Sequence, residues 1–169
     1  MIRPVARHGD PILHQRTCHV QEITTDIQRL IDDMIDTMYA APGIGLAAPQ
    51  VGVGLCIFVM DVSSGRSSDD LHVMINPEMI FHEGVQSFEE GCLSVPDLQA
   101  TVPRPKRAIV RGLNRDGKSY EIEGAGLSAR ALQHELDHLN GSLFLDRIRG
   151  IKKELILRRI KKLKRTGQW

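Results

Sequence analysis

The chain has 169 residues, of which 41% are hydrophobic and 25% charged, a balance typical of one ordinary globular domain. No apolar run approaches the roughly 20 residues that cross a bilayer, and the N-terminus lacks the apolar segment of a signal peptide. Three cysteines, an odd and small number, argue against a disulfide framework and favour a reducing compartment. We therefore expect a single domain over residues 1–169, located in the cytoplasm.

The net charge of +1 is unevenly distributed along the chain. Residues 152–165 contain eight Lys or Arg and one Glu, a balance of +7, so the rest of the chain carries −6. A mildly acidic body with a basic end bears on binding partners rather than on fold.

The first predicted element is a helix over residues 24–40. Thr24 or Thr25 can cap its start, and Pro42 with Gly43 ends it. Its apolar side chains recur at the spacing of one helical face, at Ile27, Leu30, Ile31, Met34, Ile35 and Met38.

Strands are predicted next, in runs rather than in regular alternation with helices. Residues 55–62 form a short apolar run typical of a buried strand, and residues 71–80 read as a strand with a break at Pro77. Residues 107–124 predict two strands joined by an Asp-Gly turn at 116–117.

Two further helices complete the chain, one over residues 127–141 with a stop at Gly141, the other basic, over residues 150–165. The apolar side of the basic helix is formed by Ile156, Ile160 and Leu163. This order favours an α+β fold with antiparallel sheet. The helix over 127–141 would then lie against the sheet and face a strand or loop.

The stretch QHELDHLNG, residues 133–141, carries His134, Glu135 and His138. Two histidines four apart share one face of a helix and can bind one metal ion, with the Glu near a water on that metal. We expect both to point inward, because they are accompanied by apolar Leu127, Ala131 and Leu145. A catalytic site of this kind takes three protein ligands and keeps one position open.

The third ligand could be a His, a Glu or a Cys. No His follows His138, and the one downstream Glu, Glu154, lies in the basic terminal helix. Cys92 lies in EEGCLSVPD, a tight loop between a glycine and a proline that could present a thiolate. Cys56 is most simply a core residue within an apolar strand, and Cys18 an ordinary thiol near the N-terminus.

A glycine-rich stretch, GIGLAAPQVG at residues 43–52, allows a close approach of backbone to a ligand. Gln50 offers an amide N–H₂ group that could stabilise a developing oxyanion. Taken alone, the stretch is more simply a tight helix-to-strand turn with a surface Gln.

In this order and at this spacing, GIGLAAPQ, EGCLSVP and QHELDHLNG resemble the three motifs of the peptide deformylases. The resemblance extends over essentially the whole chain and is strongest to the bacterial form with a helical C-terminus. It implies antiparallel sheets packed around a central metal-binding HExxH helix. The implied reaction is hydrolysis of the N-formyl group from the N-terminal formylmethionine of newly synthesised polypeptides, releasing formate. The implied cofactor is ferrous iron (Fe²⁺), with zinc, nickel or cobalt possible in purified protein.

The resemblance also implies catalytic roles for individual residues. Glu135 would be the general acid and base, and Gln50 with the backbone N–H of Leu93 would bind the formyl oxygen. The metal ligands would be Cys92, His134 and His138.

Substrate contacts follow from the same resemblance. Gly45 would pair its backbone with the peptide. Apart from the substrate contacts, Glu90 and Arg104 would form the family's ion pair beneath the Cys loop. Many relatives have an apolar residue where this chain has Arg130. At the mouth of the pocket this side chain would change access or peptide preference, but we expect it to point to solvent. The methionine pocket would be shaped by Ile44, Leu127, Ala131 and His134.

Two other functions are compatible with parts of the pattern. A zinc endopeptidase fits HExxH, but the missing downstream third His or Glu and the Cys loop weigh against it. A non-catalytic protein with a structural metal would need four protein ligands, and only three are found.

Residues 152–165 are expected to dock the enzyme on the ribosome near the exit of the nascent chain, where relatives with this kind of C-terminus are thought to bind. A purely solvated helix face is the alternative.

Overall fold

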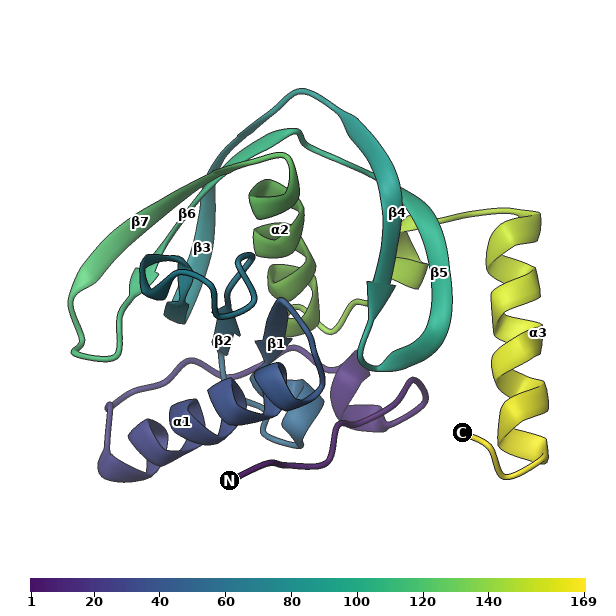
Figure 1. The fold of residues 1–169 in the computed structure, drawn as a ribbon, viewed down its shortest axis with the longest axis horizontal. Helices are drawn as coiled ribbons and strands as arrows, with labels where there is room; N and C mark the ends of the chain where they lie inside the picture. Colours follow the sequence, from purple (N-terminus) through teal and green to yellow (C-terminus); the bar gives the residue numbers. More distant parts are fainter.

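The computed structural model describes all 169 residues, Met1–Trp169, and confirms the predicted α+β fold (Figure 1). Five strands form an antiparallel sheet in the order β1-β2-β3-β6-β7, and β4 and β5 form a separate two-stranded hairpin. The strands are β1 (Gly45–Ala47), β2 (Ile57–Met60), β3 (His72–Glu83), β4 (Gln86–Cys92), β5 (Val95–Arg104), β6 (Arg107–Leu113) and β7 (Ser119–Ala125).

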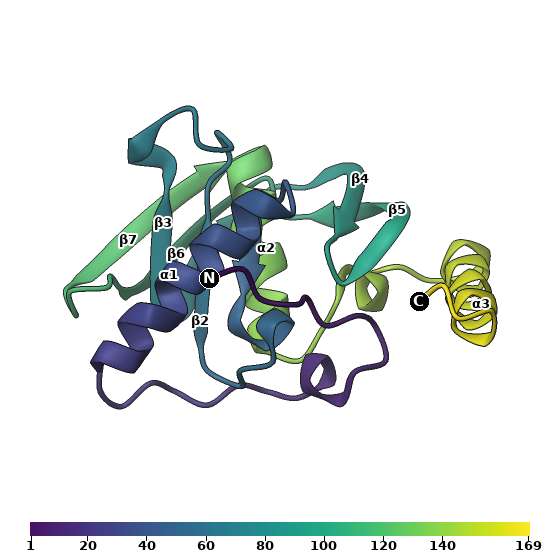
Figure 2. The ribbon, with the colours of Figure 1, turned by 60° about the horizontal axis from the view of Figure 1, so that its bottom comes forward.

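Three α-helices accompany the sheets, and α2 lies centrally between the large sheet and the β4–β5 hairpin (Figures 1 and 2). Both views place α3 at the periphery beyond β5, on the side away from β7. The helices are α1 (Thr25–Ala40), α2 (Leu127–Leu139) and α3 (Ile151–Arg165). Gly141 follows α2 with a positive φ of 76°, which agrees with the predicted stop. No helix combines the length and apolar character that crossing a membrane requires.

The helix α1 forms as its sequence predicts. Thr24 caps it, with its hydroxyl oxygen accepting a hydrogen bond from the backbone N–H of Ile27 at 3.3 Å. One apolar face is buried against β2 and β3 in a cluster that includes Leu30, Ile31, Met34, Met38, Ile57 and Val73.

The predicted break in the strand at Pro77 is wrong, because β3 continues through it to Glu83. Pro77 cannot donate a backbone hydrogen bond, and the pairing with β6 shifts register between Ile75 and Glu78. An irregularity in the pairing therefore accommodates the proline without ending the strand. The hairpin predicted at residues 116–117 is confirmed by the pairing of β6 with β7.

The segment around Cys92 is more regular than the predicted loop. Strands β4 and β5 pair from Gln86 with Arg104 to Cys92 with Val95, which leaves only Leu93 and Ser94 between them. Cys92 is therefore fixed at the end of a strand, beside a tight turn.

Two apolar clusters lie on either side of α2, the helix that carries the HExxH motif. One joins α2 to the large sheet through Phe58, Met74, Val110, Leu132 and Leu136. The other joins the hairpin to the following chain and to α3, through Val95, Val102, Phe144, Leu145 and Ile160. Complete burial of such a side chain stabilises the fold by about 1.5–3 kcal/mol. Cys56 belongs to the first cluster, which confirms it as a core residue.

Candidate active site and metal centre

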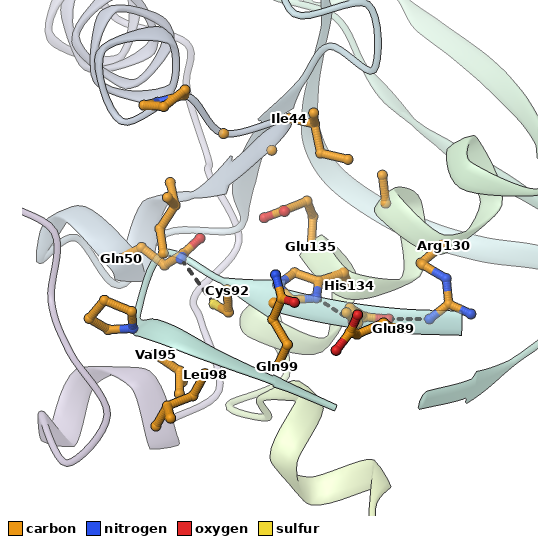
Figure 3. Close-up of a pocket in the computed structure, with 18 of the residues that line it drawn as sticks. Ile44, Gln50, Glu89, Cys92, Val95, Leu98, Gln99, Arg130, His134 and Glu135 are labelled. Atoms are coloured by element: carbon orange, nitrogen blue, oxygen red, sulfur yellow. Dashed lines mark hydrogen bonds and ion pairs between the residues drawn. The ribbon is translucent and has the colours of Figure 1, made fainter. Parts of the chain in front are cut away.

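The candidate site is a cleft of about 580 Å³ between β1, the β4–β5 hairpin and the first turns of α2 (Figure 3). All three sequence motifs contribute to its walls. The lining includes Ile44, Gly45, Gln50, Cys92, Leu93, Leu127, Ala131, His134 and Glu135. Residues more than 80 positions apart in the sequence thus meet around one small volume.

Three potential metal ligands converge beside the cleft. His138 Nε2 lies 3.4 Å from Cys92 Sγ and 3.2 Å from His134 Nε2, and one ligand atom from each residue lies within 4.8 Å of the others. Both histidines come from α2 at i and i+4, while the thiol comes from the end of β4. One thiol and two imidazoles form a donor set suited to a divalent transition metal, so the residues fit the implied cofactor.

Glu90 orients the first of these histidines. Its Oε1 lies 2.5 Å from His134 Nδ1, which leaves Nε2 of the ring directed at the other two ligands. Arg104 donates to both Glu90 oxygens, from Nε at 2.8 Å and from a terminal nitrogen at 2.5 Å. Burial alone would raise the pKa of Glu90, but hydrogen bonds from Arg104 and His134 outweigh it and hold that pKa well below its usual range.

Glu135 is almost completely buried, and its Oε2 has no hydrogen-bond partner. Burial raises the pKa of its carboxyl group to about 7. A carboxylate with a pKa near neutrality is suited both to accept and to return a proton.

Gly45 leaves room for this carboxylate. A Cβ atom added to Gly45 would collide with Oε1 of Glu135 and lie 2.8 Å from its Cδ. The glycine in β1 therefore permits the side chain of Glu135 to occupy its position in the cleft.

Gly45→Ala is expected to displace Glu135 and to lower kcat by about 10²-fold, as a misplacement of about 1 Å beside the reacting atoms does. Steady-state kinetics at saturating substrate, with metal content measured on the same sample, would check this. Gly54→Ala is the matched control, because a Cβ there meets nothing within 4 Å. A Gly45→Ala protein with the parental kcat would show that Glu135 does not need this space.

Gln50 is buried, contrary to the simpler expectation of a surface side chain. Its Oε1 accepts a hydrogen bond from the Ala47 backbone N–H at 2.9 Å, which fixes which end of the amide faces the site. Its Nε2 donates to Ser94 Oγ at 3.1 Å and lies 3.6 Å from Cys92 Sγ. The amide donor is thereby held beside the thiol of Cys92.

The apolar surroundings of the histidines differ in one respect from the expectation. Ala131 and Leu145 are buried, but Leu127 is 54% exposed at the cleft. Because α2 begins at Leu127, its side chain reaches the mouth of the cleft rather than the core.

The expectation that Arg130 points to solvent is wrong. Arg130 is 5% exposed and pairs with Glu90 at 2.5 Å, because the buried carboxylate has room for a second guanidinium.

Three contributing residues were missed by reasoning from the sequence. Ser94 orients Gln50, and Asp137 pairs with Arg104 at 2.9 Å and with Arg147 at 2.6 Å. The third is Arg130. A signal for two of them was present, since positions 130, 134 and 137 share one helical face. Ser94 follows Cys92 by only two residues.

The chain is similar to known proteins over nearly its whole length. The polypeptide deformylase family pattern matches residues 2–154. A peptide deformylase from Acidobacterium capsulatum is 47% identical over 169 residues, covering 100% of this chain and 99% of that protein.

Solved structures give the same result. The crystal structure of a peptide deformylase from Legionella pneumophila matches with a TM-score of 0.92 at 42% identity, covering 99% of this chain and 98% of that one. A peptide deformylase from Ehrlichia chaffeensis in complex with actinonin matches with a TM-score of 0.88 at 34% identity, covering 97% and 98%. The chain therefore belongs to the polypeptide deformylase family, the metal-dependent hydrolases that remove the N-formyl group from newly synthesised polypeptides.

Proposed function

We propose that Cys92, His134 and His138 hold one divalent metal ion in this chain, and that Glu135 transfers the proton during deformylation. The observation that carries this proposal is the convergence of the three donor atoms within 4.8 Å, next to a buried carboxylate with an unpaired oxygen. We further propose that the ion in the cell is ferrous iron. A thiol and two imidazoles also suit zinc, nickel and cobalt, so these can replace iron in purified protein.

The bound metal would polarise the formyl oxygen and lower the pKa of a water from 15.7 toward about 7. Glu135 accepts a proton from the attacking water and returns it to the leaving nitrogen, which departs as the free amine of methionine. Gln50 Nε2 and the Leu93 backbone N–H donate hydrogen bonds to the formyl oxygen as negative charge develops there. Each such donor contributes about 3–4 kcal/mol to the transition state.

The peptide would bind in an extended conformation along β1. This strand is at the edge of the large sheet, so the Gly45 backbone is available to pair with an added strand. The methionine side chain would occupy the part of the cleft lined by Ile44, Leu127, Ala131 and His134. Because the formyl group is small, a narrow reaction position would exclude ordinary acyl amides, and this would separate the reaction from proteolysis.

An assay on formyl-Met-Ala-Ser, with metal analysis of the same sample, tests the assignment. Activity should disappear on removal of the metal, return with ferrous iron, and be inhibited by actinonin, which we propose occupies this same cleft. His138→Ala should lose both metal and activity. Cleavage of a peptide bond in unformylated Met-Ala-Ser would instead support an endopeptidase, and full metal retention by His138→Ala would contradict the ligand set.

We propose that the ribosome is a partner of α3 and that deformylation takes place in the cytoplasm. Ile160 is 2% exposed and packs against the hairpin cluster, so the helix can dock on the body while its charge faces outward. The exposed basic side chains are Lys152, Arg158, Arg159, Lys161, Lys162, Lys164 and Arg165. Such a face suits RNA phosphates, and binding through it weakens as the salt concentration rises, because releasing counterions into a more concentrated solution gains less free energy.

Replacing Lys162 and Arg165 by Gln is expected to weaken co-sedimentation with ribosomes at low salt and reduce the salt slope by about one per lost phosphate contact. Hydrolysis of short formyl-peptides should not change, because both side chains are exposed and neither lines the cleft. Lys106→Gln with Lys118→Gln, also exposed, is the matched control. Equal ribosome binding by the two double variants would mean that α3 does not bind the ribosome and is only a solvent-exposed helix.

A further inference from the structure

The two elements that would hold the metal are separate in the fold. His134 and His138 lie on α2, whereas Cys92 ends β4 in a hairpin that belongs to no larger sheet. A shift between helix and hairpin would therefore move the thiol away from both imidazoles. The position of the thiol therefore depends on side-chain contacts between the hairpin and the helix.

Arg130 makes this connection from the first half of α2 (Figure 3). One terminal nitrogen of its guanidinium donates to Glu90 Oε2 on β4 at 2.5 Å. The other donates to the backbone oxygen of Val102 on β5 at 3.1 Å. The guanidinium also lies 5.7 Å from the ring centroid of Phe88 on β4. One side chain thus contacts both strands of the hairpin.

The same contact acts on the ligand His134. Glu90 Oε2 is held by Arg130 and by Arg104 Nε, while Oε1 lies 2.5 Å from His134 Nδ1. The bidentate contact of Arg104 sets the plane of the carboxylate, and Arg130 adds a second hydrogen bond to Oε2 from the helix side. Arg104 alone, which comes from β5, ties Glu90 to its own hairpin, although it also reaches Asp137 on α2 at 2.9 Å.

We propose that Arg130 is a positioning residue for the metal centre: it clamps the hairpin that carries Cys92 to the helix that carries His134 and His138. The proposal rests on the proposed ligand set. Removing the guanidinium leaves the Val102 carbonyl without this donor and Glu90 with one charged partner fewer, both in a buried setting. Loss of a residue that orients metal ligands without binding the metal itself typically lowers metal affinity by about 10–100-fold.

Arg130→Met tests the clamp, because methionine retains much of the apolar stem and removes every donor. Metal affinity would be measured on the full chain by competition with a chelator, and the visible spectrum of the cobalt-loaded protein would report the geometry of the thiolate and imidazole ligands. We expect a 10–100-fold weaker affinity and a changed cobalt spectrum. Arg111→Met, which removes an exposed arginine paired with Glu121, is the control and should match the parent.

Arg130→Lys shows whether the contact with Glu90 is sufficient or whether the contact with the Val102 carbonyl is needed as well. Lysine can donate to Glu90 but cannot hold the Val102 carbonyl with the same planar fork, so its affinity should lie between those of the parent and Arg130→Met. Parental affinity in Arg130→Lys would overturn the two-strand clamp, and it remains informative if Arg130→Met does not fold.

Arg130 also lines the cleft, so a direct substrate contact must be distinguishable from a clamp. A raised KM for formyl-Met-Ala-Ser with parental metal affinity and cobalt spectrum would overturn the proposal. Failure of the ligand set itself would be seen separately, as metal retention in His138→Ala, whatever Arg130 does.

Discussion

Glu135→Ala is expected to lower kcat for formyl-Met-Ala-Ser by about 10²–10⁴-fold, the usual cost of losing a general base, while the metal stays bound. The side chain is buried, its Oε2 is unpaired, and burial raises its pKa to about 7. It lies between the two histidines in sequence but is not among the three converging ligands. Removing it therefore takes away the proton acceptor and leaves the metal donors in place.

The measurement is single-turnover or steady-state hydrolysis on protein whose metal content is determined in parallel. Glu135→Gln is the second variant, because it preserves the shape of the side chain and cannot accept the proton. Near-parental kcat in either metal-replete variant would contradict the role of Glu135. Loss of metal in both would mean that the residue serves binding rather than proton transfer.

Cys92→Ser is expected to lower metal affinity by more than about 100-fold. This exceeds the effect of losing a residue that only orients a metal ligand. The thiol is the one sulfur donor in the cluster, and as a thiolate it would bind a transition metal far better than a neutral hydroxyl does. The same electron-rich sulfur would make this residue the most sensitive to peroxide. Activity and bound metal should therefore fall together.

Chelator competition on three serine variants checks this prediction. Cys18 is exposed and Cys56 is buried in the core, and neither belongs to the ligand cluster. Cys18→Ser should retain metal and activity, while Cys56→Ser should retain metal and lose some stability. If Cys92→Ser binds metal as tightly as the parent, the third ligand lies elsewhere.

Elements with strong local signals were predictable from the sequence. The helix α1 has one continuous apolar face and a Thr cap, and the β6–β7 hairpin has an Asp-Gly turn between alternating strands. The β4–β5 hairpin was missed for a physical reason. Several of its inward-facing positions are polar and do not face an apolar core. Glu90 and Arg104 belong to the buried ion-pair network, and Gln86 donates to the backbone carbonyls of Pro105 and Gly126.

The site was predictable where its residues form local motifs, and less so where distant residues meet. The spacing of His134 and His138 alone indicated a metal site on a helix, but the identity of the third ligand came from a resemblance to a family. Arg130 was expected in solvent because arginine rarely is buried without a partner. That partner, Glu90, is 40 residues away in the sequence and lies on another element, so no local sequence pattern predicts the pairing.

X-ray absorption at the metal edge of the zinc-loaded full chain tests the ligand set, because it identifies the atoms bound to the ion. We expect one sulfur at about 2.3 Å and two imidazole nitrogens at about 2.0–2.1 Å, with the remaining position taken by a light atom. The sulfur shell should vanish in Cys92→Ser. A first shell without sulfur in the parent protein, or one with sulfur that survives Cys92→Ser, would contradict the assignment of Cys92, His134 and His138 as the metal ligands.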